Sequence, residues 1–154
     1  AAAIKAGFPS ESGTPQPAIA KSYPPPIKTW LVADMDEVEK VARDPLWKVI
    51  DVREAERYRG ETEPYDLVAG HIPGAINIPY TENLGADGHF LAADVLNKKY
   101  RAYDLNMDRT IVHCGSGVTA CHTLLAMYQA GLGLARLYPG SFSEWSRNNK
   151  PIGP

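Results

Sequence analysis

A short β-branched stretch that runs into a glycine-rich turn and then into an apolar helix pattern constrains this chain most. Residues 110–113 read Thr-Ile-Val-His, residues 114–119 read Cys-Gly-Ser-Gly-Val-Thr, and apolar residues then recur at helical spacing as far as Ala130. β-Branched residues favour strands, and Gly131 is a typical helix stop. The stretch predicts a strand–turn–helix unit with Cys114 at the carboxyl end of the strand.

Strand and helix signals alternate over most of the remaining chain. Short apolar runs at 49–52, 75–78 and 135–138 predict further strands. Asp34 followed by Glu37 has capping-box spacing and predicts the start of a helix. Strands separated by helices imply an α/β fold with a mostly parallel central sheet and helices on both faces. Such sheets bind ligands beyond the carboxyl ends of their strands.

The first 29 residues have a different character. Glycine and proline recur through them, including Pro24-Pro25-Pro26, and they read as an extended, stiff linker that follows the end of a helix at 1–6. We therefore expect two regions. Residues 1–29 are the remnant of a preceding domain plus its interdomain linker, and residues 30–154 are one domain of ordinary size.

Composition narrows the classes of function. The formal net charge of the chain is −2 and no basic block occurs, so nothing indicates nucleic acid as a partner. The apolar runs are far shorter than the ~20 residues that cross a bilayer, and the first residues do not read as a signal peptide. Two cysteines make a poor disulfide framework, which favours a reducing, cytoplasmic setting. No spacing of His, Cys and carboxylate residues predicts a metal site.

The turn that begins at Cys114 has the features of an anion-binding loop. Its two glycines allow a tight curl, which can point successive N–H groups inward, and the helix start adds unpaired donors and a positive dipole end. The same field favours a thiolate, and a thiolate is a ready nucleophile. The alternative is that Cys114 is a small core residue. The paired glycines favour the functional interpretation, because a core cysteine does not need them.

The dipeptide His113-Cys114 also resembles the start of the protein phosphatase motif His-Cys-x5-Arg. The arginine of that motif would stand at position 120, where this sequence has Ala120. Without a guanidinium group the phosphoryl transition state lacks its bidentate partner. Phosphatase activity is therefore disfavoured.

Five motifs in a fixed order carry a closer resemblance. They are residues 51–53 (Asp-Val-Arg), 57–60 (Arg-Tyr-Arg-Gly), 70–75 (Gly-His-Ile-Pro-Gly-Ala), 114–122 (Cys-Gly-Ser-Gly-Val-Thr-Ala-Cys-His) and 138–145 (Tyr-Pro-Gly-Ser-Phe-Ser-Glu-Trp). Together they resemble the rhodanese superfamily, specifically the catalytic C-terminal domain of two-domain thiosulfate and 3-mercaptopyruvate sulfurtransferases. The resemblance covers nearly the whole chain and implies the rhodanese-like α/β fold.

The resemblance implies a sulfurtransferase whose catalytic residue is Cys114. Its thiolate takes sulfur from 3-mercaptopyruvate or thiosulfate, holds it as a persulfide, and passes it to a thiophilic acceptor such as cyanide, a thiol or a protein. No cofactor is implied, and the expected partner is an N-terminal rhodanese domain. The implied substrate-binding residues are Arg57, Gly115, Ser116, Gly117, Val118 and Thr119.

The donor and the presence of catalysis each leave an alternative open. The loop sequence resembles the mercaptopyruvate type, which favours 3-mercaptopyruvate over thiosulfate. However, the family places a second substrate arginine in a Glu-Pro-Arg-Asp segment, where this sequence has Tyr65. The alternative to an enzyme is a non-catalytic binding or regulatory module, since many domains of this family serve only as scaffolds.

The other polar and sulfur-containing residues are expected to be structural. We expect His71 to fix a turn by hydrogen bonding, and Asp51 to pair with Arg53 at a strand end. Further expectations are Gly140-Ser141 packed near the active loop, Trp145 in the core, His89 and His122 on the surface, and Cys121 buried beside Leu125 and Tyr128.

Overall fold

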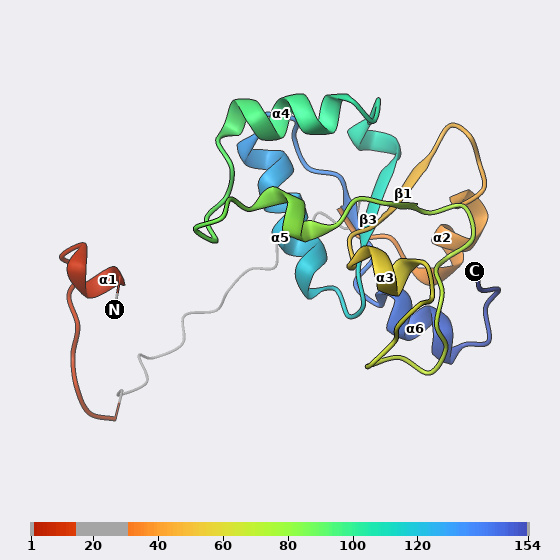
Figure 1. Cartoon of the computed structure of the whole chain (residues 1–154), viewed down its shortest axis with the longest axis horizontal. Coiled ribbons are helices and arrows are strands. Elements are labelled where there is room, and N and C mark those ends of the chain that lie inside the picture. Colours follow the sequence, from red (N-terminus) through yellow and green to blue (C-terminus); the bar gives the residue numbers. More distant parts are fainter. Residues whose placement is uncertain (1, 15–30, 154) are drawn as a thin grey trace, which may run out of the picture.

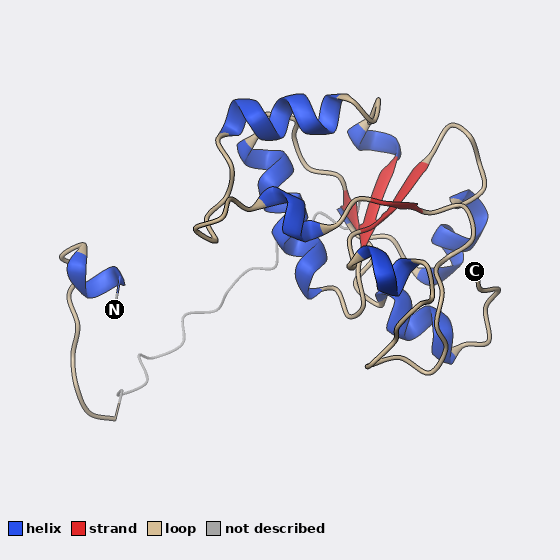
Figure 2. Cartoon of the chain, in the orientation of Figure 1, coloured by secondary structure: helices blue, strands red, loops and turns tan. Residues whose placement is uncertain are grey.

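The structure, a computed structural model, describes residues 2–14 and 31–153 and has a parallel β-sheet at its centre. Its strands are β1 (Lys48–Asp51), β2 (Ile76–Asn77), β3 (Thr110–His113) and β4 (Arg136–Leu137), in the order β2-β1-β3-β4 (Figure 2). All three neighbouring pairs are parallel. Each strand overlaps a run predicted from the sequence, so the mostly parallel α/β sheet is confirmed.

Helices connect the strands and cover both faces of the sheet (Figure 1). The α-helices are α1 (Ala2–Lys5), α2 (Met35–Val41), α3 (Ala55–Tyr58), α4 (Ala93–Arg101), α5 (Val118–Gln129) and α6 (Ser141–Arg147), with 3-10 turns η2 (Tyr80–Asn83) and η3 (Met107–Arg109). The predicted cap of α2 is confirmed, because the Asp34 carboxylate accepts a hydrogen bond from the Glu37 N–H at 2.8 Å. Among the helices of residues 2–14 and 31–153, none has the length and apolar character needed to span a membrane.

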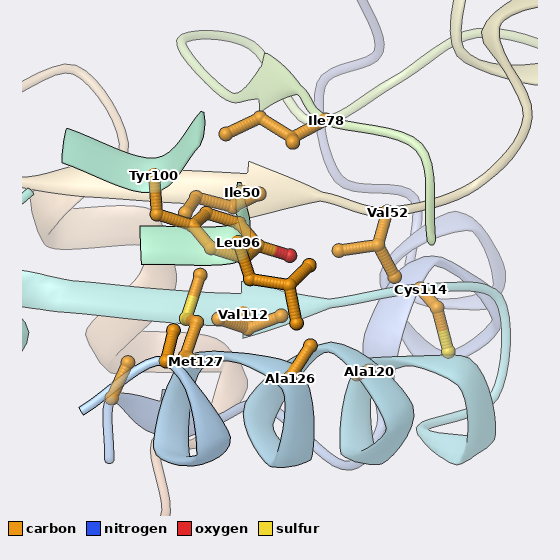
Figure 3. Close-up of a cluster of buried hydrophobic side chains, with 12 residues drawn as sticks. Ile50, Val52, Ile78, Leu96, Tyr100, Val112, Cys114, Ala120, Ala126 and Met127 are labelled. Carbon is orange, nitrogen blue, oxygen red and sulfur yellow. The ribbon is translucent and has the colours of Figure 1, made fainter. Parts of the chain in front are cut away.

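The alternation of side chains along the strands creates two cores, one on each face of the sheet. Ile50 and Val112 point to the face covered by α4 and α5, where they join a buried cluster with Met127 (Figure 3). Val49 and Ile111 point to the opposite face and pack in a second cluster with residues of α2 and α6. Each fully buried aliphatic side chain contributes about 1.5–3 kcal/mol to stability.

Helix α5 carries two apolar stripes, and only one of them faces the core. Ala120 and Met127 are fully buried against the sheet. The other stripe, which we call the α5 outer stripe, is exposed and consists of Val118, Cys121, Leu125 and Tyr128. The expectation that Cys121 is buried is therefore wrong. Since both stripes are apolar and repeat at helical spacing, the sequence pattern alone did not distinguish the buried face from the exposed one.

A buried ion pair joins the end of β1 to the loop that follows α3. The guanidinium of Arg53, which is 1% exposed, binds the Asp51 carboxylate at 2.7 Å and the Gly70 carbonyl at 2.7 Å. It also donates to Glu63 at 3.1 Å and stacks over the Phe142 ring at 3.9 Å. The predicted pairing of Asp51 with Arg53 is confirmed. The contacts of Arg53 reach from β1 to Phe142 in α6.

Replacing Arg53 with alanine is expected to lower the free energy of unfolding by about 3–5 kcal/mol, because the buried Asp51 carboxylate loses its guanidinium partner. Arg59 provides a matched control, since it pairs with Glu61 on the surface and both side chains are about half exposed. Arg59→Ala is expected to leave stability unchanged within error. Denaturant unfolding measures both variants, and equal effects would contradict this account of the buried pair.

Candidate active site

Cys114 lies directly after β3, at the carboxyl edge of the sheet and before α5 (Figure 3). Cys114 is only 2% exposed and belongs to the buried cluster on the sheet face that α5 covers. It nevertheless forms part of the wall of a pocket of about 340 Å³. The residues that line this pocket are Arg57, Tyr65, Asp66, Cys114, Gly115, Ser116, Val118, Thr119 and Ser143. Cys114 is thus a nearly buried residue in the wall of this pocket.

The first turn of α6 holds the backbone at Cys114. The Ser141 hydroxyl accepts a hydrogen bond from the Cys114 N–H at 3.2 Å, and the Cys114 carbonyl accepts one from the Phe142 N–H at 3.0 Å. The Ser143 N–H donates to the Gly115 carbonyl at 2.8 Å. These contacts confirm that Gly140-Ser141 packs near the loop. They also fix the first two residues of the loop, Cys114 and Gly115, against α6.

The loop itself keeps unpaired donors. In the part of the chain that the structure describes, no protein group accepts a hydrogen bond from the N–H groups of residues 115–117. Helix α5 begins at Val118 without a side-chain cap, so the N–H groups of its first turn add to this set. Unpaired amides at a helix start, together with its positive dipole end, favour an anion.

Gly117 shapes the loop rather than lining the pocket. Its φ is +83°, and a Cβ at this position would lie 2.7 Å from the Pro139 carbonyl oxygen. Both the left-handed conformation and the close approach therefore require glycine. Gly115 differs, since a Cβ there would meet the nearest atom, Nη2 of Arg57, at an ordinary 3.4 Å.

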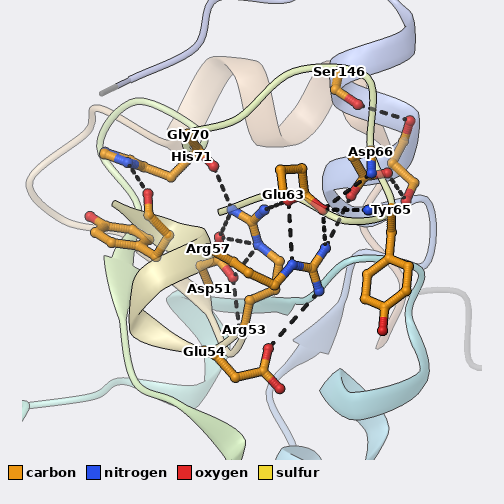
Figure 4. Close-up of polar contacts among 12 residues, drawn as sticks. Asp51, Arg53, Glu54, Arg57, Glu63, Tyr65, Asp66, Gly70, His71 and Ser146 are labelled. Carbon is orange, nitrogen blue, oxygen red and sulfur yellow. Dashed lines mark hydrogen bonds and ion pairs between the residues drawn. The ribbon is translucent and has the colours of Figure 1, made fainter. Parts of the chain in front are cut away.

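The predicted site residue Arg57 is brought to this loop from α3. Its side chain is 13% exposed and its guanidinium lies beside Gly115. Nη2 is 2.8 Å from Glu63 Oε1 and 3.4 Å from Asp66 Oδ2 (Figure 4). The structure therefore places Arg57 in the same pocket as Cys114 and pairs it with two carboxylates.

Glu63 lies between the guanidinium groups of Arg53 and Arg57 (Figure 4). Its carboxylate is 4% exposed and also accepts the backbone N–H groups of Tyr65 and Asp66, each at 3.1 Å. Burial raises the pKa of Glu63, but the hydrogen bonds from Arg57 and from the two amides outweigh it and hold the pKa below its usual range. Glu63 is therefore an anion that links the structural arginine to the pocket arginine.

Glu63, Asp66 and Ser143 are site residues that reading the sequence missed. Asp66 and Ser143 line the pocket, and the Ser143 hydroxyl donates to the Asp66 carboxylate. One signal was present, since the segment from Glu63 to Asp66 was singled out for the tyrosine at its third position. The contact with Ser143 spans 77 residues of sequence and gives no local signal.

His71 has the structural role expected of it. Its Nδ1 lies 2.9 Å from the Tyr58 carbonyl oxygen, and its ring stacks on the Tyr58 ring with centroids 4.0 Å apart. Its backbone pairs with Gly153 through two hydrogen bonds. His71 therefore fixes the turn and does not line the pocket.

The expected positions of Trp145 and His89 are confirmed, and that of His122 is not. Trp145 is buried and donates to the Pro151 carbonyl at 2.8 Å, and the His89 side chain is 84% exposed. The expectation of a surface position is wrong for His122, whose ring stacks on Phe90 at 4.5 Å and is half-buried. Burial lowers the pKa of His122. Within residues 2–14 and 31–153, no group of three His, Cys, Asp or Glu residues is placed to hold a metal ion.

These features define a parallel α/β domain with a cysteine at a strand end, inside a pocket that offers unpaired amides and a guanidinium group. The profile of the family described as Rhodanese-like domain matches residues 34–148. The chain belongs to this family.

Several relatives of this chain are named as sulfurtransferases. The Pseudomonas aeruginosa protein named "Probable 3-mercaptopyruvate sulfurtransferase" is 45% identical over 117 residues, which are 75% of this chain and 41% of that protein. The thiosulfate sulfurtransferase of Gallus gallus is 33% identical over 149 residues, which are 96% of this chain and 51% of that protein. The solved structure of 3-mercaptopyruvate sulfurtransferase from Leishmania major matches with a TM-score of 0.71 and 32% identity, over 97% of this chain and 42% of that one. The chain thus spans about half of these proteins, or less.

Replacing Gly117 with alanine is expected to destabilise the domain because it adds both backbone strain and a clash. Gly131→Ala is the matched control, since Gly131 has a φ of +72° but open space around the position of a Cβ. The control is expected to cost about 1–2 kcal/mol for strain alone, and Gly117→Ala more. Thermal or denaturant unfolding compares the two, and equal losses would contradict the close approach to Pro139.

Proposed function

We propose that this domain is a sulfurtransferase that carries sulfur as a persulfide on Cys114. The observation that supports it most is the position of the Cys114 thiol in a pocket next to unpaired amides and the guanidinium of Arg57. A thiolate in such surroundings is a nucleophile, and the amides stabilise the negative charge of its product. Sulfurtransferases among the relatives support the same reaction.

The reaction divides into loading and unloading. In loading, the Cys114 thiolate attacks the outer sulfur of thiosulfate and sulfite leaves with the electron pair of the broken S–S bond. With 3-mercaptopyruvate, the C–S bond breaks instead, and the thiol proton passes to the carbon to give pyruvate. In unloading, the terminal persulfide sulfur is attacked by an acceptor such as cyanide, which leaves as thiocyanate and restores the Cys114 thiolate.

The residues around the thiol receive distinct roles in this proposal. Arg57 binds the anionic end of the donor, and the backbone of Gly115, Ser116 and Val118 stabilises the loaded sulfur. The Thr119 backbone contributes in the same way, and Gly117 sets the curl of the loop. The Ser116 hydroxyl orients the thio-ketoacid donor and relays the thiol proton toward the departing carbon, which favours 3-mercaptopyruvate as the donor.

We further propose that residues 30–154 are the catalytic domain and that residues 1–29 connect it to an N-terminal rhodanese domain. Two observations support this arrangement. The chain spans about half or less of the relatives it matches. The α5 outer stripe is exposed and begins at Val118, at the pocket itself, so a second domain placed there would cover apolar surface and narrow the pocket.

Neither cysteine of the described chain is in a disulfide, which supports a reducing, cytoplasmic setting.

The proposed loading step has a direct test. Incubation with 3-mercaptopyruvate or thiosulfate, followed by intact mass measurement, is expected to show one added sulfur, which cyanide then removes. Cys121→Ser is the matched control and is expected to load normally, whereas Cys114→Ser is expected to gain nothing. Failure of the wild type to load with either donor would favour the non-catalytic module, and loading of Cys114→Ser would place the sulfur elsewhere.

Replacing Arg57 with lysine is expected to raise the KM for the donor by roughly tenfold and to change kcat less, because lysine keeps the charge but loses the bidentate fork. Arg59→Lys, two residues away and about half exposed, serves as the control with no expected effect. Steady-state kinetics with cyanide as acceptor measures both. An unchanged KM in Arg57→Lys would remove Arg57 from the donor site.

A further inference from the structure

Asp66 places a negative charge inside the donor pocket. Its side chain is 1% exposed and lines the pocket with Cys114. Oδ2 lies 3.4 Å from Nη2 of Arg57 (Figure 4). Oδ1 accepts a hydrogen bond from the Ser143 hydroxyl and lies 3.9 Å from Nη2 of Arg147. The carboxylate is therefore held by several donors at once and is not free to turn into solvent.

The groups that hold Asp66 are those that an anionic donor needs. Arg57 is the cationic side chain that lines the pocket, and Ser143, which also lines it, supplies a hydroxyl. Both contact the Asp66 carboxylate. Asp66 therefore occupies part of the position that the anionic end of a donor would take, and a donor either displaces it or shares Arg57 with it.

The ion-pair network to which Arg57 and Asp66 belong carries no net positive charge. Three guanidinium groups are connected to four carboxylates within 4.0 Å, which leaves one net negative charge. The arginines are Arg53, Arg57 and Arg147, and the acids are Asp51, Glu54, Glu63 and Asp66. A small dianion entering this pocket would meet the Arg57 cation already neutralised.

The outer part of the pocket offers apolar surface. Tyr65 is 76% exposed, Val118 is 72% exposed, and both line the pocket. The Tyr65 ring also lies against Arg57, with the guanidinium carbon 5.0 Å from the ring centroid. Such a wall suits the carbon skeleton of an organic donor better than a fully hydrated inorganic anion.

We infer that Asp66 is a specificity-determining residue whose charge selects organic donors with a single negative charge and penalises dianionic donors. The inference rests on the proposed sulfur transfer at Cys114 and names the residue that sets its donor class. By Coulomb's law the penalty grows in proportion to donor charge. A dianion such as thiosulfate is therefore penalised about twice as much in free energy as a monoanion such as 3-mercaptopyruvate.

The Asp66→Asn variant tests this by comparing kcat/KM for the two donors. The variant is expected to raise kcat/KM for 3-mercaptopyruvate by roughly threefold to tenfold, and for thiosulfate by about the square of that factor. Glu61→Gln is the matched control, because it also removes one negative charge from this segment. The Glu61 carboxylate pairs with Arg59 on the surface and does not line the pocket. Equal changes for both donors, or a fall for both, would overturn the inference.

A second measurement is independent of turnover, and its first comparison needs no Asp66 variant. In the Cys121→Ser background, Cys114 is alkylated with anionic iodoacetate and with neutral iodoacetamide, and the ratio of the two rates is compared with the ratio for cysteine in a short neutral peptide. The ratio is expected to be at or below that of the peptide, and to rise roughly threefold to tenfold in Asp66→Asn. A ratio well above that of the peptide in the presence of Asp66 would show a positive pocket and overturn the inference. This result stands even if neither donor loads sulfur, so failure of the inference and failure of the proposed function remain distinguishable.

Discussion

The position of the pocket in this domain depends on one buried carboxylate that bridges two arginines. Glu63 binds Arg53, which is locked to the end of β1, and Arg57, which faces the Cys114 loop. Two guanidinium groups this close repel each other unless an anion lies between them. Because Arg53 also stacks on Phe142 of α6, the same bridge connects the sheet, the loop after α3 and the helix that anchors the active loop.

The second constraint is geometric and comes from the backbone. The first turn of α6 accepts and donates hydrogen bonds at Cys114 and Gly115, while the amides of residues 115–117 are left without protein acceptors. The first residues of the loop are fixed and the following amides have no protein acceptor, so the loop is already arranged to bind an anion. Binding an anion there requires little reorganisation. The thiol thus combines apolar packing on one side with a polar pocket on the other.

Local sequence patterns predicted the features that depend on neighbouring residues. Strand runs, the Asp34 cap and the strand–turn–helix unit around Cys114 follow from propensity and spacing, and the resemblance added Arg57. What spacing did not reveal depends on distant contacts. Cys121 was expected to be buried because α5 has two apolar stripes, and only the packing against the sheet decides between them. Asp66 gained no role because its partners Ser143 and Arg147 come from α6, far along the chain.

The most direct test of the central claim is a crystal structure of the protein after treatment with a sulfur donor. The account predicts one additional sulfur bonded to Sγ of Cys114, within hydrogen-bond distance of the backbone amides of the loop that follows. The account would be contradicted if Cys114 stayed unmodified while those amides faced solvent, or if the added sulfur lay among the apolar side chains with no amide near it.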